Sequence, residues 1–202
     1  YVSGRNKYYV QRSFFAFPFG ANQITAGHSI LSATFYYYAY INDDANMILL
    51  KSGHTNGTTS EDWFSTWLTN LGGTLSGWSG SDSEVVQYST NASNAPGGLS
   101  GYSSIPLGSN FLSDATTQAT SGLSIDTTNF VMMEYDHDYL DSTPSDDSAV
   151  TGHYYYNGHS TRRPYIEYTT GVSGYGNEVI GLETKKIYAL DTDDVDNVIG
   201  LE

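Results

Sequence analysis

The chain has 202 residues, enough for one sizeable domain. It is 14% aromatic and only 15% charged, with 18 tyrosines and 21 glycines, and this composition favours strands and turns over helices. The formal net charge of −14, with 8 Lys and Arg, argues against nucleic acid or an anionic membrane as a partner, because both attract basic patches. No apolar run has the length that spans a bilayer, so we expect no membrane insertion.

The segment 31–41 is predicted to be a strand with two different faces. Side chains alternate along a strand, so Phe35 faces the core, while Tyr36, Tyr38 and Tyr40 face outward. Three interpretations of the outward tyrosines stay open: ordinary outer-sheet residues, a platform that stacks sugars, and a subunit interface, where Tyr is enriched.

The remaining elements are predicted mostly as strands. Eight strands are expected, the number that a jelly roll needs: 8–17, 31–41, 47–51, 84–88, 105–107, 130–135, 153–156 and 164–168. One helix is predicted at 60–68, with one further helical turn within 110–120 and a long loop at 89–104. Trp78, in a Gly- and Ser-rich context, is the tryptophan that we expect to be exposed, as a contact for a subunit or a glycan.

An acidic loop follows the strand at 130–135. Asp136, Asp138 and Asp141 offer oxygen ligands of the kind that calcium prefers. A calcium site and a plain solvated acidic loop are both open interpretations of these residues.

The composition changes near residue 170, so we expect a sandwich domain at 1–170 and a Gly-rich linker with an acidic tail at 171–202. The tail contains a short repeat, because residues 177–183 recur at 196–202. Two such copies cannot bury a core of their own, so the tail is expected to pack on the domain or on a neighbouring subunit. Its candidate contact residues are Val179, Ile180, Val198 and Ile199.

Catalytic signatures are not found in the sequence. The five histidines are scattered without metal-site spacing, there is no cysteine, and no nucleophile elbow is present. We therefore expect a protein that is not an enzyme.

The segment 9–17 is an Arg-containing strand that ends in Phe, and 30–37 begins with the pattern Ile-x-Ser-Ala-Thr. These two segments resemble the opening strands of DNRLRE-type β-sandwich modules, and the resemblance covers about residues 8–168. The segment 163–168, Arg-Pro-Tyr-Ile-Glu-Tyr, resembles the family's closing strand, and 134–136 resembles its late strand. One difference is that 18–20, Pro-Phe-Gly, replaces the family's acidic turn.

The resemblance implies a jelly-roll-like, all-β sandwich of the kind found in secreted, cell-surface and phage or environmental virion proteins. The leading hypothesis is thus a non-enzymatic structural protein of a virion surface or extracellular fibre, assembling through its tail and outer tyrosines. The alternative is a carbohydrate-binding module of a larger secreted protein. The chain begins at Tyr1 rather than Met, which suggests processing or an excerpt of something longer.

Overall fold

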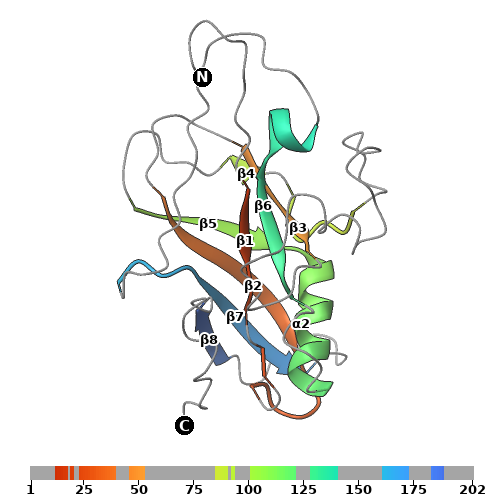
Figure 1. Ribbon diagram of the computed structural model, residues 1–202. Coiled ribbons are helices and arrows are strands. Elements are labelled where there is room, and N and C mark those ends of the chain that lie inside the picture. The colour runs from red at the N-terminus through yellow and green to blue at the C-terminus, as the bar shows by residue number, and fades with distance from the viewer. Residues whose placement is uncertain are drawn as a thin grey trace, which may run out of the picture.

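Two antiparallel four-stranded sheets face each other in a computed structural model of the chain (Figure 1). The structure describes residues 12–17, 19–20, 23–39, 46–52, 85–90, 92–93, 101–121, 128–140, 161–172 and 183–188. Most connections between successive strands cross from one sheet to the other. The all-β, jelly-roll-like sandwich predicted from the sequence is confirmed.

The first sheet has the order β1-β6-β3-β4. Its strands are β1 (Ser13–Phe15), β6 (Phe130–Glu134), β3 (Asn46–Lys51) and β4 (Ala92–Ser93). β3 and β6 are nearly continuous apolar runs, as expected for strands that are buried on both faces. One face packs into the main core, and the other contacts a second cluster that includes Phe14, Val85 and Tyr139.

The second sheet has the order β5-β2-β7-β8. Its strands are β5 (Gly101–Leu107), β2 (His28–Ala39), β7 (Tyr165–Val172) and β8 (Glu183–Tyr188). The predicted alternation in β2 is confirmed, because Ala33, Phe35 and Tyr37 are buried in the main core and the residues between them are not. This sheet therefore presents one face to the core and leaves the other face outward.

Aromatic rings fill the space between the sheets. The Phe35 ring lies 4.9 Å from that of Phe15 and 5.1 Å from that of Phe130, in edge-to-face arrangements that aromatic pairs prefer. Phe17 stacks on Phe130 at 5.6 Å. Phe15 and Phe17 both lie in the main core, whereas Phe14 packs against the second cluster.

The helix α2 (Ser109–Ser121) closes one end of the sandwich beside β2 (Figure 1). Only one helical turn was predicted here, because the segment is rich in Ser and Thr, which are poor helix formers. Phe111, Ala115 and Ala119 are four residues apart and buried in the core, so packing along one face stabilises all 13 residues.

Several predicted elements differ from the structure. Residues 85–88 form no strand, since only Gln87 makes a bridge, to Leu50; the segment bends so that Val85 packs on the second cluster and Tyr88 in the main core. The predicted loop at 89–104 contains β4 and the start of β5. The acidic loop begins with a π-helical turn, η3 (Tyr135–Tyr139).

The second sheet extends past residue 170, where the sequence predicted a linker. β7 continues to Val172, and β8 pairs with it from Tyr165↔Tyr188 to Thr170↔Glu183. The physical reason is that Ile187 of β8 is buried in the main core, which gives this part of the predicted tail a packing partner. The predicted helix 60–68 and the predicted strand 153–156 lie outside the described residues.

Candidate functional site: the outer tyrosine face

Four tyrosines from three strands meet on the outward side of the second sheet. Tyr36 lies opposite Tyr165 in the β2–β7 register, and Tyr38 lies opposite Tyr102 in the β2–β5 register. Residues that are paired across strands in this way bring their side chains together on one face. We call these four tyrosines, with Arg162 and Lys186, the outer tyrosine face.

The four rings contact one another in a continuous cluster. Tyr36 and Tyr165 are stacked, with centroids 4.8 Å apart and planes at 10°. Tyr102 contacts both Tyr38, at 5.6 Å, and Tyr165, at 5.4 Å, in edge-to-face geometry. The Tyr102 hydroxyl donates to the backbone carbonyls of Thr161 and Arg163, at 3.2 and 3.0 Å. The cluster is therefore fixed both by ring contacts and by hydrogen bonds.

Two cations lie over the rings. The Arg162 guanidinium carbon is 4.6 Å from the centre of the Tyr38 ring, and Lys186 Nζ is 4.7 Å from that of Tyr165. Both distances fall in the range of cation–π attraction. Lys186 Nζ also lies 3.5 Å from a carboxylate oxygen of Glu167, its neighbour across the β7–β8 pair.

The ring faces are thus largely occupied from within the protein. A sugar that stacks on an aromatic platform needs an open ring face, whereas here the faces of Tyr165 and Tyr38 contact another ring or a cation. Tyr102, which is 40% exposed, is the most open ring of the cluster. What the surface offers a partner is a fixed set of ring edges together with cationic groups, a combination typical of protein interfaces.

Sequence reasoning identified half of the described tyrosines on this face. Tyr36 and Tyr38 were predicted from strand alternation, whereas Tyr102 fell in a predicted loop and Tyr165 and Lys186 were not singled out. The alternation of Tyr165 with buried Ile166 was the signal available for Tyr165. The other predicted contact residues lie outside the described residues: Tyr40, Trp78, Val179, Ile180, Val198 and Ile199.

Two of the aspartates predicted to bind calcium, Asp136 and Asp138, lie in η3 and have hydrogen-bond partners elsewhere in the chain. Asp138 accepts two hydrogen bonds from Arg12, from Nε at 2.9 Å and from Nη2 at 2.6 Å. Asp136 accepts one from Asn46 Nδ2 at 2.7 Å. The Glu134 carboxylate accepts from the backbone N–H groups of both aspartates and so caps the turn.

Asp141 lies outside the described residues. Across the described ranges, no group of three or more His, Cys, Asp or Glu has an arrangement that could hold a metal ion. Calcium binding by Asp136, Asp138 and Asp141 stays a prediction.

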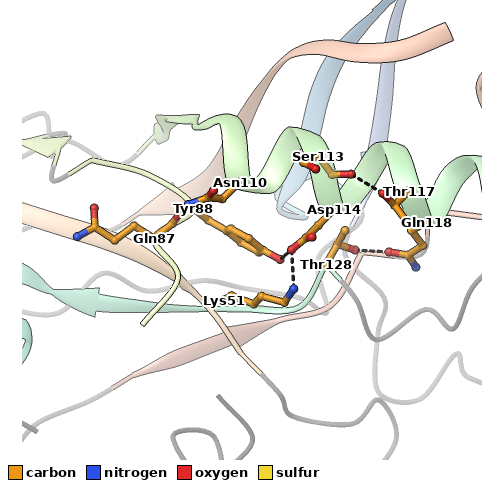
Figure 2. A network of polar contacts seen from close by, with 9 residues as sticks. All are labelled: Lys51, Gln87, Tyr88, Asn110, Ser113, Asp114, Thr117, Gln118 and Thr128. Carbon is orange, nitrogen blue, oxygen red and sulfur yellow. Dashed lines mark hydrogen bonds and ion pairs between the residues drawn. The ribbon is translucent and has the colours of Figure 1, made fainter. Parts of the chain in front are cut away.

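A second polar cluster lies between α2 and the first sheet (Figure 2). Asp114 Oδ2 accepts hydrogen bonds from the Tyr88 hydroxyl and from Lys51 Nζ, each at 2.6 Å. Burial raises the pKa of Tyr88 well above its usual value, and the adjacent Asp114 carboxylate raises it further. The Tyr88 ring is fully buried against Phe111 at 5.2 Å, so this cluster attaches the helix to the sheet.

Comparisons with known proteins give no match to a family model, to a curated protein or to a solved structure. The resemblance to DNRLRE-type modules therefore rests on its sequence motifs. Neither described helix is long and apolar enough to cross a membrane.

Proposed function

We propose that the protein is a non-enzymatic structural subunit of a virion surface or an extracellular fibre, which contacts its neighbours through the outer tyrosine face and its C-terminal segment. The observation that carries the proposal is that the ring faces of Tyr38 and Tyr165 already contact a cation or another ring of the same protein. Stacking of Tyr36 on Tyr165 and the cations over Tyr38 and Tyr165 fix the cluster before any partner arrives. Fixed side chains lose little entropy on binding, which favours association.

The proposed setting has two supports. The resemblance is to modules found in secreted, cell-surface and virion proteins. A net charge of −14 keeps copies soluble and apart, so that association is confined to surfaces with opposing charge, as at Arg162 and Lys186.

Self-association measured by sedimentation velocity over a hundredfold range of concentration tests the proposal. The decisive variant is Tyr102→Ser, which removes the most exposed ring and should weaken association. Tyr37→Phe is the matched control, because Tyr37 is buried on the opposite side of β2 and should leave association unchanged. A wild-type chain that stays monomeric at every concentration would contradict the proposed self-assembly.

The C-terminal segment should be tested with a chain that ends at Tyr188. A deletion from residue 171 would also remove β8 and the end of β7, and would confuse folding with assembly. Unchanged assembly of the chain that ends at Tyr188 would remove the segment from the proposal.

A carbohydrate-binding module is the second candidate, favoured by the exposure of Tyr102 beside Tyr165. A glycan array probed with and without calcium tests it. Binding that is lost in Tyr102→Ser supports this candidate, and signals at background in both conditions count against it.

A further inference from the structure

We infer that the acidic segment 191–202 of one copy binds the outer tyrosine face of the next copy. This inference rests on the proposed function and names the two surfaces that meet. Assembly is then a contact between two different parts of the protein, each of which belongs to a different copy.

Charge complementarity is the first argument. The segment 191–202 contains five carboxylate side chains and no Lys or Arg. Of the 8 Lys and Arg in the whole chain, four lie at 162, 163, 185 and 186, just before the start of β7 and in β8. In a chain with a net charge of −14, this part of the second sheet offers an acidic ligand four of the six Lys and Arg that lie within the described residues.

The Arg162 guanidinium is suited to bind a carboxylate. It lies over the Tyr38 ring, and no hydrogen bond or ion pair joins it to any residue that the structure describes. A guanidinium that stacks on a ring keeps its N–H donors in its own plane, so they remain available to a carboxylate from outside. The stacking holds the group in place, which reduces the entropy that binding would cost.

The starting point of the segment is the second argument. β8 ends at Tyr188, whose register partner is Tyr165 of the outer tyrosine face. An extended chain advances about 3.3 Å per residue, so the segment 191–202 can reach at most about 40 Å. β8 ends beside the start of β7, at the Arg162 end of the face, and a segment of this reach is long enough to contact the same end of a neighbouring copy's face.

A contact of this kind joins two different surfaces, so a pair of copies still has one face and one segment that can each contact a further copy. Such heterologous contacts generate rings if the rotation closes and open filaments if it does not. This geometry fits a fibre or a repeated surface layer.

Two full-length variants test the inference. The face variant carries Arg162→Gln and Lys186→Gln, and the segment variant carries Asp193→Asn and Asp194→Asn. Each loses the charges of about two exposed ion pairs, so the association constant should fall about tenfold or more. Lys185→Gln is the matched control, because it removes one charge beside Lys186 from a side chain that bonds to the Gln23 carbonyl instead.

Mixing the two variants gives the decisive result. The face variant retains a normal segment, and the segment variant retains a normal face. In sedimentation velocity, each alone should be monomeric at a concentration where the wild type forms larger species. Their equimolar mixture should form a 1:1 dimer and nothing larger, because only one productive contact remains.

The other outcomes each overturn the inference. If both variants assemble like the wild type, the segment does not bind this face, although the proposed assembly function survives. If each is monomeric and the mixture is too, the segment binds its own face or does not bind. If the wild type never assembles, the proposed function fails as well. Circular dichroism melts of both variants verify that each is folded.

Discussion

The ion pair between Arg12 and Asp138 should be important for stability because it is buried. The two side chains are only 6% and 7% exposed, and two hydrogen bonds join them in bidentate geometry. Replacing Asp138 by Ala takes both of these hydrogen bonds from the buried Arg12 guanidinium, and breaking a buried pair in this way is strongly destabilising. We predict that Asp138→Ala destabilises the protein by about 3–5 kcal/mol.

The size of this effect can be checked by urea unfolding monitored by circular dichroism. A loss of about 3–5 kcal/mol is a large part of the roughly 5–15 kcal/mol that stabilises a typical domain. For a chain of this size it corresponds to a fall in Tm of roughly 6–20 °C. The m value should not change, because the folded state keeps its compactness.

Glu167→Gln is the matched control. It breaks a pair with Lys186 whose side chains are 46% and 35% exposed, at a longer distance of 3.5 Å. Exposed pairs are worth about 0–1 kcal/mol, so this variant should be close to the wild type. An Asp138→Ala cost as small as that of the control would refute the reasoning. The double variant Arg12→Met/Asp138→Leu should recover much of the stability, since no buried charge remains.

Three further predictions concern buried tyrosines and calcium. Burial raises the pKa of Tyr37 from 10 to about 12, and Ser103 opposes this by a smaller amount. The contribution of Tyr37 to the free energy of unfolding is therefore fully present below pH 10 and is lost as the pH rises toward 12. Melts at alkaline pH should show a loss of up to about 2.7 kcal/mol, and Tyr37→Phe should not show it. Tyr88→Phe removes the hydrogen bond to Asp114 and should cost about 1.5–3 kcal/mol in urea unfolding, whereas Tyr102→Phe should cost less because its hydroxyl is exposed. If calcium is bound, a chelator should lower Tm; an unchanged Tm would remove the three aspartates as ligands.

The elements that could be predicted are those with strong local patterns. Strict alternation identified the faces of β2, and apolar runs identified β3 and β6. These patterns depend only on which side chains face the core, so they are readable from the sequence.

The elements that could not be predicted depend on contacts between distant residues. α2 has weak helix propensity and is stabilised by core packing of Phe111, Ala115 and Ala119. The outer tyrosine face needs the registers that place Tyr102 and Tyr165 beside β2, and a sequence carries no direct signal of register between strands 60 or more residues apart. Asp136 and Asp138 bind Asn46 and Arg12, which precede them in the sequence by 90 and 126 residues.

The strands at the two borders of the second sheet have a consequence for the proposed assembly. Among the described strands these borders are β5, which contains Pro106, and β8, which contains Lys185 and Lys186. Proline and lysine on border strands discourage further strand pairing, which is how natural sheets avoid aggregation. We therefore expect the proposed assembly to grow through side-chain contacts, and any filaments to lack the 4.7 Å cross-β reflection of amyloid.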